Sequence, residues 1–480
     1  MISARLVVAA GLALAASVSG GTAALAQEQG QAVLRVGGPG AAYSTVSEAL
    51  QAAAPGDTIS VGRGTYQEQL VITKPVVMVG EGWPVIDGAR QGHVIEAHAP
   101  ITLTGFIIRG SGKDVDAEDS GLLVHAGPAR VEHNSFEDVF YGIYLKDAGG
   151  SSIVSNSILG KDLPMSRRGD GIRLWHSSGT RIADNEVTGT RDVVIFFSDS
   201  LSVVRNTVTG GRYGLHYMYS NHNRFEENTF ANNQVGAFIM YSSDIELTGN
   251  VFAEAMKSDG YGIGLKDADD IRITDNLMIG NGAGIYLDNS PSNPAATNAI
   301  ERNVLAGNSS GVTLLPSVQG NEFRGNDFVD NSSSVLLSGG GGSQERNTWI
   351  GNYWSGYSGF DTDGDGVGDT PFSHSRLADE LMSASPSLQW FRGSPVVGLL
   401  GVLSRFFPLL RPQPVLTDQT PRLKPGSLAA WRGHAALVAA KPPFGLRRAL
   451  WLVAFATLSV LAGAGMGRVL RPRSIAGTVS

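Results

Sequence analysis

Residues 206–250 read NTVTGGRYGLHYMYSNHNRFEENTFANNQVGAFIMYSSDIELTGN, which is two repeats of 22 residues and the first residue of a third. Each repeat begins at an asparagine and contains a short alternating segment that opens at Gly214 or Gly236. A unit this short cannot bury its apolar side chains alone and must stack on its neighbours. The asparagine recurs at similar intervals, at Asn134, Asn156, Asn185, Asn206, Asn228, Asn250, Asn276, Asn303 and Asn326.

A repeat of this length is also found in leucine-rich proteins, but the L-x-x-L-x-L-x-x-N signature and its helical segment are missing. Short strands between Asn and Gly turns predict an all-β fold, a right-handed parallel β-helix with one coil per repeat. We expect about ten coils over residues 33–347, with stacked asparagines hydrogen-bonded at the turns. Thr45 to Glu48 form a capping-box pattern. It predicts an N-terminal capping helix through Ala53 that covers the open end of the solenoid.

Period-two alternation assigns the two faces of the strand in each repeat. Residues such as Leu215 and Tyr217 point into the core, whereas His216 and Met218 point to solvent. Four successive coils therefore place large apolar side chains on one outer face, which is typical of a binding surface or of a face covered by another part of the chain. These side chains are Trp175, Phe196, Phe197, Met218, Tyr219, Phe238, Met240 and Tyr241. We expect partner contacts from Trp175, Phe196, Tyr219, Phe238 and Tyr241.

The repeat register places Met218 and Met240 one strand spacing apart, about 4.8 Å, with His216 on the same face. Thioether sulfur and imidazole suit copper(I), so His216, Met218 and Met240 are candidate copper ligands. The alternative is that the aromatic rings stack on a sugar, because β-helices often host carbohydrate enzymes. The exposed positions show no stacked pair of carboxylates for glycoside chemistry. No catalytic set is found, which favours a protein that is not an enzyme, and a carbohydrate-binding or carbohydrate-active protein stays the alternative.

An acidic loop follows the last repeat. Asp361, Asp363, Asp365 and Asp369 occupy positions 1, 3, 5 and 9 of a pattern with glycine at position 6, as in the first part of a calcium loop. Position 12 is Phe372 instead of the bidentate glutamate. Structural calcium and a plain acidic turn both remain open. In either case residues 348–375 are expected to form a C-terminal cap.

The composition and the two ends of the chain bear on location. The 480 residues carry a net charge of −7 and no cysteine, which excludes disulfides and thiolate chemistry and makes nucleic acid an unexpected partner. Residues 1–26 read as an export signal peptide. Residues 376–446 form an apolar, Pro-rich docking tail. Residues 449–467 lack ionisable side chains and predict a C-terminal membrane helix, followed by a basic tail over 468–480.

The segment RYGLHYMYSN at 212–221, together with GDGIRLW at 169–175 and the block 352–372, resembles the signature of the NosD family, periplasmic maturation proteins of nitrous oxide reductase. The resemblance covers residues 33–420. It implies a β-helix that docks on an ABC transporter made of ATPase and permease subunits. It also implies that copper arrives from a membrane-anchored copper chaperone and that the protein helps to assemble the copper centre of nitrous oxide reductase. Within the matching motifs, the resemblance implies that Trp175, His216, Met218 and Tyr219 form the copper-binding or partner-binding site.

The membrane segment departs from this family pattern, which is expected to end near Pro421. The export signal predicts a periplasmic location, and the C-terminal helix is expected to tether the protein to the inner membrane.

Overall fold

The structure is a computed structural model that describes residues 31–255, 260–338, 346–374 and 416–427. The predicted signal peptide, the membrane segment 449–467 and the basic tail lie outside the described residues, as does most of the docking tail. Within the described ranges, no helix is both long and apolar enough to cross a bilayer.

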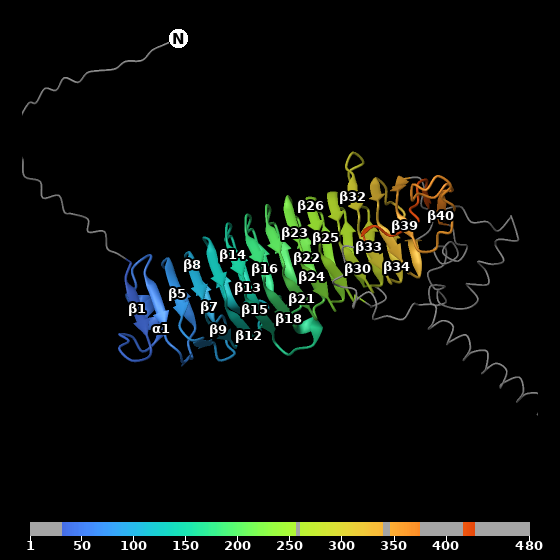
Figure 1. The fold of residues 1–480 in the computed structure, drawn as a ribbon. Coiled ribbons are helices and arrows are strands. Elements are labelled where there is room, and N and C mark those ends of the chain that lie inside the picture. The colour runs from blue at the N-terminus through green and yellow to red at the C-terminus, as the bar shows by residue number, and fades with distance from the viewer. Residues whose placement is uncertain (1–30, 256–259, 339–345, 375–415, 428–480) are drawn as a thin grey trace, which may run out of the picture.

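The described chain is a right-handed parallel β-helix whose strands form three long sheets (Figure 1). Successive coils add one strand to each sheet, and all neighbouring strands within the three sheets run parallel. The first sheet has 14 strands. These are β1 (Val33–Val36), β2 (Thr58–Val61), β5 (Val76–Gly80), β8 (Ile101–Thr104), β11 (Ala129–Glu132), β14 (Ser152–Val154), β17 (Arg181–Ala183), β20 (Ser202–Val204), β23 (Asn223–Glu226), β26 (Ser243–Thr248), β29 (Asp269–Thr274), β32 (Asn298–Glu301), β35 (Asn321–Arg324) and β38 (Thr348–Ile350).

The second sheet has 13 strands. These are β3 (Thr65–Tyr66), β6 (Val85–Asp87), β9 (Ile107–Arg109), β12 (Ser135–Val139), β15 (Ser157–Gly160), β18 (Glu186–Thr188), β21 (Thr207–Thr209), β24 (Thr229–Ala231), β27 (Val251–Ala253), β30 (Leu277–Ile279), β33 (Val304–Ala306), β36 (Asp327–Val329) and β39 (Tyr353–Trp354).

The third sheet has 12 strands and carries the residues of functional interest. These strands are β4 (Leu70–Ile72), β7 (Ile95–Ala97), β10 (Ser120–Val124), β13 (Tyr141–Lys146), β16 (Ile172–Trp175), β19 (Asp192–Phe196), β22 (Tyr213–Met218), β25 (Val235–Met240), β28 (Tyr261–Lys266), β31 (Ala283–Asp288), β34 (Ser310–Leu314) and β37 (Ser333–Leu337). A short 3₁₀ helix, η1 (Met165–Arg167), interrupts the loop between β15 and β16.

The all-β prediction is confirmed, but the expected number of about ten coils is too low, because the first sheet alone contains 14 strands. The missing coils lie at the N-terminal end, where the asparagine mark does not occur. Phe106, which is fully buried, occupies the corner position that Asn134 takes one coil later, and its backbone N–H donates to Oδ1 of Asn134 at 3.1 Å. An apolar side chain can therefore fill the same corner, and a search for asparagine misses those coils.

Stacked asparagines hold the corner after the first sheet. From Asn134 to Asn326 each backbone N–H donates to Oδ1 of the next asparagine at 2.8–3.0 Å. The ladder continues to Asn352 and ends on Asp418, whose Oδ2 accepts from the backbone N–H of Asn352 at 2.9 Å. Because these side chains are buried, the ladder satisfies polar groups that would otherwise be costly. It also fixes the coil register.

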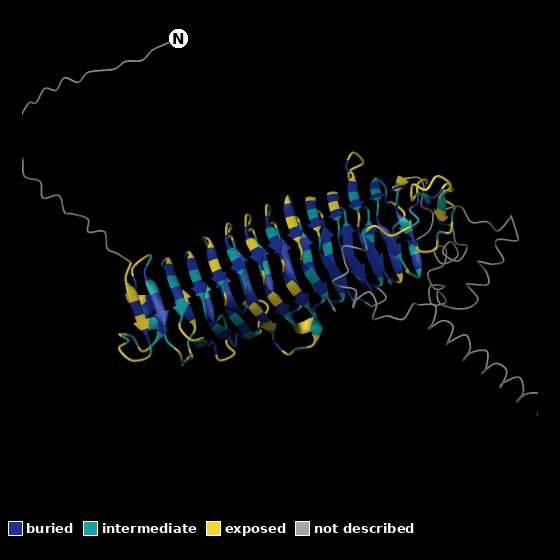
Figure 2. Cartoon of the chain, in the orientation of Figure 1, coloured by how far each residue is buried: buried dark blue, intermediate teal, exposed yellow. Residues whose placement is uncertain are grey.

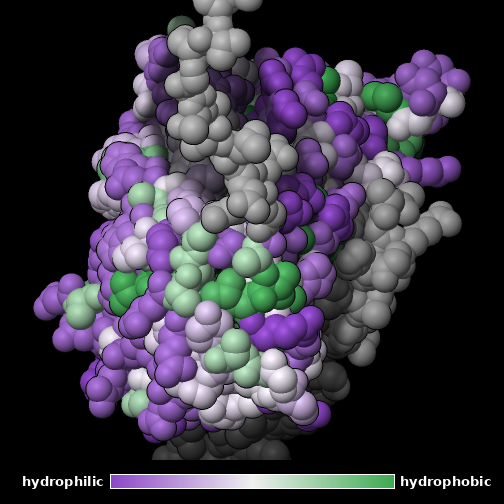
Figure 3. All heavy atoms as spheres, turned by 90° about the vertical axis from the view of Figure 1, so that its left-hand side faces the viewer, coloured by the Kyte–Doolittle hydropathy of each residue, from purple (hydrophilic) through white to green (hydrophobic). Residues whose placement is uncertain are grey.

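The predicted capping helix is α1 (Val46–Ala52), and it lies at the β1 end of the solenoid (Figure 1). Its capping box is present: Glu48 N–H donates to Oγ1 of Thr45 at 3.2 Å, and Thr45 N–H donates to Oε2 of Glu48 at 3.2 Å. The helix buries Val46, Ala49 and Leu50 against the first coils. Seen from this end, the uncovered surface mixes hydrophilic residues with a small hydrophobic group (Figure 3).

The other end is closed by residues that are distant in sequence. The antiparallel strands β40 (Phe372–His374) and β41 (Leu416–Asp418) pair beside the final coils. Between the two ends the strands are largely buried, and exposed residues concentrate at the turns (Figure 2).

Candidate metal and partner-binding site

The outer face of the 12-stranded sheet carries two columns of side chains in strand register. In one column Trp175 lies opposite Phe196, Phe196 opposite Met218, and Met218 opposite Met240. In the adjacent column His216 lies opposite Phe238. We call Trp175, Phe196, His216, Met218, Phe238 and Met240 the thioether–aromatic strip. The 22-residue spacing thus places the two sulfur-bearing side chains on neighbouring strands, as the sequence predicts.

The strip is less exposed than the sequence suggests. Leu215 and Tyr217 are buried in the core as expected, and Met218 lies outside the core in a half-buried position. Met240, however, is only 8% exposed, so the expectation that it faces open solvent is wrong. Side chains on neighbouring parallel strands stand about 4.8 Å apart and cover one another. Alternation identifies the outer face, but it does not determine exposure.

The strip has cationic residues at both ends. Lys146 lies opposite Trp175 on one side, and Lys266 lies opposite Met240 on the other. Lys146 pairs with Glu118, and Nζ of Lys266 is 3.0 Å from Oδ2 of Asp288. The apolar and sulfur-bearing segment of this column therefore spans four strands and is bounded by ion pairs.

A stack of rings borders the strip at the next corner. His176, Phe197, Tyr219 and Tyr241 follow the four strands, and neighbouring rings lie 5.0, 5.3 and 5.1 Å apart with interplanar angles of 5–15°. Phe197, Tyr219 and Tyr241 are exposed, and Tyr219 retains 46% of its accessible surface. The stack forms an apolar edge along the strip.

The backbone at this corner is unfavourable for aromatic residues. His176, Phe197, Tyr219 and Tyr241 all have φ between 48 and 51°, a left-handed conformation that costs an ordinary L-residue about 1–2 kcal/mol. The flanking coils place residues better suited to this conformation at the same corner, namely Asp147, Asp267 and Asn289, with φ of 50, 47 and 47°. Local conformation favours Asp or Asn throughout. Histidine also tolerates this conformation, so Phe197, Tyr219 and Tyr241 are the three residues of the stack that the local backbone does not favour.

Serines that directly follow the ring stack in successive coils are linked by hydrogen bonds. The backbone N–H of Ser198 donates to Oγ of Ser220 at 2.9 Å, and the N–H of Ser220 donates to Oγ of Ser242 at 3.1 Å. The Oγ of Ser220 also donates to the carbonyl of Met218 at 3.0 Å. These bonds fix the main chain of the residues that carry the sulfur atoms.

A buried carboxylate orients His216. Nδ1 of His216 lies 3.4 Å from Oδ2 of Asp192, a distance at the long end for a hydrogen bond, and is otherwise buried without a hydrogen-bond partner among the described residues. Burial alone would raise the pKa of Asp192, but the contacts with His216 and Arg212 outweigh it and hold the pKa at about 2. Asp192 is thus ionised at neutral pH. With Nδ1 turned to Asp192, Nε2 is the ring nitrogen left for a ligand.

Asp192 is part of a wider charged group. Arg212 Nε donates to Oδ1 of Asp192 at 3.1 Å, and Arg191 Nε lies 3.5 Å from Oδ2 of Asp192 and 3.3 Å from Oδ1 of Asp170. Asp170 also pairs with Nη1 of Arg173 at 2.8 Å. The two buried acids and their arginines fix one side of the strip.

The repeat pattern of the sequence does not identify Asp192 as a site residue. In the structure Asp192 lies opposite Tyr213 and Val194 lies opposite His216, so the register shifts by a β-bulge between them. A bulge can re-aim a side chain. The sequence does contain one indication of a special role: position 192 is aspartate, whereas the corresponding position in the next coils is glycine. There a Cβ would meet a neighbouring carbonyl, at 2.5 Å for Gly214.

The acidic loop brings together only part of its predicted set. Carboxylate oxygens of Asp361, Asp363 and Asp365 lie within 4.8 Å of one another. Asp369 is engaged elsewhere, since its Oδ2 accepts from the backbone N–H of Thr362 at 2.9 Å. Asp361 accepts from the N–H groups of Gly364 and Gly366, at 2.7 and 3.0 Å.

Fold and strip together define a class of protein: a parallel β-helix that displays thioether, imidazole and aromatic side chains on one outer face. Residues 154–359 match the family model described as "Periplasmic copper-binding protein (NosD)". The chain is 28% identical over 381 residues to the "Probable ABC transporter binding protein NosD" of Stutzerimonas stutzeri, covering 75% of this chain and 85% of that protein. The protein of the same name in Pseudomonas aeruginosa is 27% identical, over 76% and 88% of the two chains. These matches confirm the resemblance to the NosD family that the sequence motifs predict.

Among solved structures, the A-module of the Azotobacter vinelandii mannuronan C-5 epimerase AlgE4 superposes with a TM-score of 0.51 at 15% identity. The match covers 63% of this chain and 93% of the module. At this identity the similarity shows the fold alone.

Proposed function

We propose that the protein is a periplasmic accessory protein that binds copper(I) on the thioether–aromatic strip during maturation of the copper centre of nitrous oxide reductase. The observation that carries the proposal is the register of β22 and β25, which sets Met218 opposite Met240 with His216 two residues away on the same face. The family model and the relatives' names support a copper and transporter context.

The donor set suits copper(I) as cargo. Thioether sulfur is soft and selects copper(I), and imidazole is also a common copper ligand. Asp192 lies beside Nδ1 of His216, where a carboxylate supports a metal-bound histidine in other proteins. Because Met240 is buried and Met218 half-buried, water competes weakly for the ion.

The ring stack supports docking of a protein beside the strip. Aromatic residues are enriched at interfaces, and Phe197, Tyr219 and Tyr241 present exposed rings here. Trp175, Phe196 and Phe238 add half-buried rings within the strip. We infer that a membrane-anchored copper chaperone approaches this edge. An ABC transporter, which supplies ATP hydrolysis, and nitrous oxide reductase are the other proposed partners. The segment 449–467 is proposed to tether the protein to the inner membrane.

The test is a copper(I) titration against a chromophoric chelator. Met218→Leu/Met240→Leu removes both sulfur atoms at nearly constant volume, and such swaps usually cost less than about 1.5 kcal/mol of stability. Met165→Leu in η1, a methionine that is not part of the thioether–aromatic strip, is the control. The proposal expects the double variant to lose tight binding and the control to retain it. Equal affinity in all three proteins would remove the strip from the proposal.

The alternative function, carbohydrate binding, rests on the same exposed rings. A glycan array distinguishes it: glycan binding that is lost in Phe197→Asn and Tyr219→Asn, without any copper(I) binding, would favour this reading.

The acidic loop is proposed as a structural calcium site. Three carboxylates already lie together, although Phe372 stands at the position of the bidentate glutamate. Calcium binding there would strengthen the C-terminal cap, and its absence would leave the copper proposal unchanged.

A further inference from the structure

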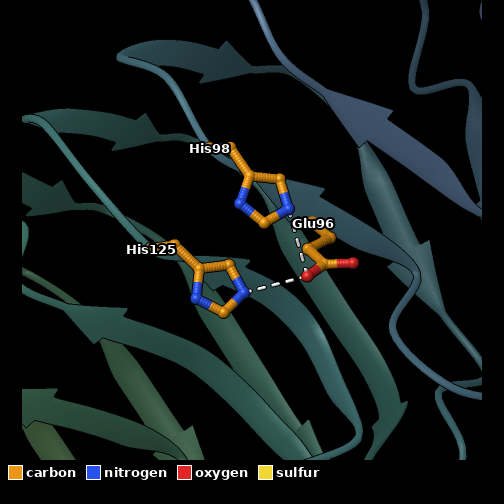
Figure 4. Close-up of side chains that lie close together, drawn as sticks. All are labelled: Glu96, His98 and His125. Atoms are coloured by element: carbon orange, nitrogen blue, oxygen red, sulfur yellow. Dashed lines mark hydrogen bonds and ion pairs between the residues drawn. The ribbon is translucent and has the colours of Figure 1, made fainter.

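A second group of metal-ligating side chains lies on the same outer face, near the N-terminal end of the 12-stranded sheet. Glu96 is the central residue of β7, and His98 follows two residues later on the same face. Ala97 lies opposite Val124 of β10, so the next residues along each strand, His98 and His125, are also neighbours. Figure 4 shows the three side chains converging from the two strands.

The three side chains share one focal point. Oε1 of Glu96 lies 3.2 Å from Nε2 of His98 and 2.9 Å from Nε2 of His125. The imidazole rings are parallel, with centroids 4.6 Å apart and an interplanar angle of 1°. Both histidines thus direct the same ring nitrogen to the same carboxylate oxygen.

These spacings approach those of a coordination sphere. With zinc–ligand distances of about 2.0–2.1 Å, two ligand atoms at a tetrahedral angle are separated by about 3.3 Å. Both Glu96–His distances are close to this value. The ligand atoms of the whole group lie within 4.8 Å of one another, so a modest approach of the two rings completes the site. The side chains of His98 and His125 are 44% and 33% exposed, which gives them room to move and leaves coordination positions open.

We propose that Glu96, His98 and His125 bind a divalent transition-metal ion, copper(II) or zinc(II). Two imidazoles and one carboxylate form a borderline donor set that suits these ions, whereas the soft thioethers of the strip suit copper(I). His125 and Met218 occupy the same column, four strand spacings apart. That separation is about 19 Å. The two groups are therefore separate, and the divalent site does not depend on the proposed copper(I) function.

The test uses copper(II) and zinc(II) themselves. Wild-type protein is expected to bind one equivalent of copper(II), and the electron paramagnetic resonance spectrum should show nitrogen hyperfine structure from two imidazoles. Calorimetry should show that the protein also binds zinc(II). His98→Gln/His125→Gln should weaken both by at least about 10-fold. Glu96→Gln, which keeps the shape but removes the charge, should weaken them less.

Two controls keep the result specific. His133→Asn changes an exposed histidine at the turn after β11 and should leave both affinities unchanged. Met218→Leu/Met240→Leu should also retain divalent binding, even if copper(I) binding is lost. Thermal unfolding without metal checks that each variant is folded. Equal affinity of wild type and His98→Gln/His125→Gln, or a copper(II) spectrum without imidazole nitrogens, would overturn the proposal.

Discussion

Replacing Asp192 with Asn tests whether this buried carboxylate stabilises the fold and positions His216 in the thioether–aromatic strip. The ordinary pKa of 3.8 falls to about 2 in the folded chain, because the contacts from His216 and Arg212 outweigh burial. At about 1.4 kcal/mol per tenfold change in the acid equilibrium, this difference corresponds to about 2 kcal/mol of folding free energy at neutral pH. Asn keeps the shape of the side chain and removes the charge. We therefore expect Asp192→Asn to lose at least about 2 kcal/mol at pH 7.

The pH dependence follows from the direction of the pKa. Since the pKa is lower in the folded than in the unfolded chain, the carboxylate stabilises the protein above about pH 4. That contribution is lost as the pH falls toward 2. Urea unfolding of the metal-free wild type and of Asp192→Asn, measured from pH 7 to pH 2, should give stability curves that converge at the acidic end. Copper(I) affinity should fall by about 10–100-fold in the variant, because His216 loses the group that orients it.

The chain offers a matched control in an exposed pair of the same type. Nδ1 of His222 is 2.7 Å from Oδ2 of Asp244, and these side chains are 64% and 53% exposed. A surface pair of this kind contributes about 0–1 kcal/mol, so Asp244→Asn should change neither stability nor copper affinity noticeably. Parallel stability curves for wild type and Asp192→Asn down to pH 2, or an unchanged copper(I) affinity, would refute the reasoning.

Other predictions address the ladder, the ring stack and the acidic loop. Asn228→Ala removes the buried Oδ1 that accepts two hydrogen bonds from Asn206 and the Nδ2 that donates to the carbonyl of Val203, and it should cost about 2–4 kcal/mol in urea unfolding. A loss below about 1 kcal/mol would contradict the stabilising role of the asparagine ladder. Asn suits the left-handed backbone of Tyr219 at φ 51°, so Tyr219→Asn should leave the free energy of unfolding within about 1 kcal/mol of wild type. The variant should no longer bind the copper chaperone in a pull-down, and undiminished binding would contradict docking at the ring stack. Asp363→Asn should remove any calcium-dependent rise in the melting temperature, and a rise that persists would place calcium elsewhere.

The asparagine periodicity predicts the fold because the ladder uses one residue type at one corner. Asn228 repeats Asn206 after 22 residues, and the structure joins the two by a hydrogen bond of 2.9 Å. The N-terminal coils escape this search because Phe106 fills the corner without a polar side chain. The periodicity therefore identifies the solenoid, but counting the asparagine marks underestimates the number of coils.

The site is predictable only to the level of strand faces. Alternation places Met218 and Met240 outside the core, but the burial of Met240 depends on neighbouring side chains that no local pattern describes. The contact between Asp192 and His216 lies at a β-bulge, and a regular repeat does not reveal a single-residue register shift. Glu96 and His125 are 29 residues apart in coils that lack the asparagine mark. Their convergence becomes evident only when β7 and β10 are paired.

X-ray absorption spectroscopy of the protein loaded with one equivalent of copper(I) tests the central claim most directly. The strip predicts sulfur scattering from two thioethers together with one imidazole, and Met218→Leu/Met240→Leu should lose the sulfur signal. A copper(I) environment made only of nitrogen and oxygen, or sulfur scattering that survives in the double variant, would contradict the account.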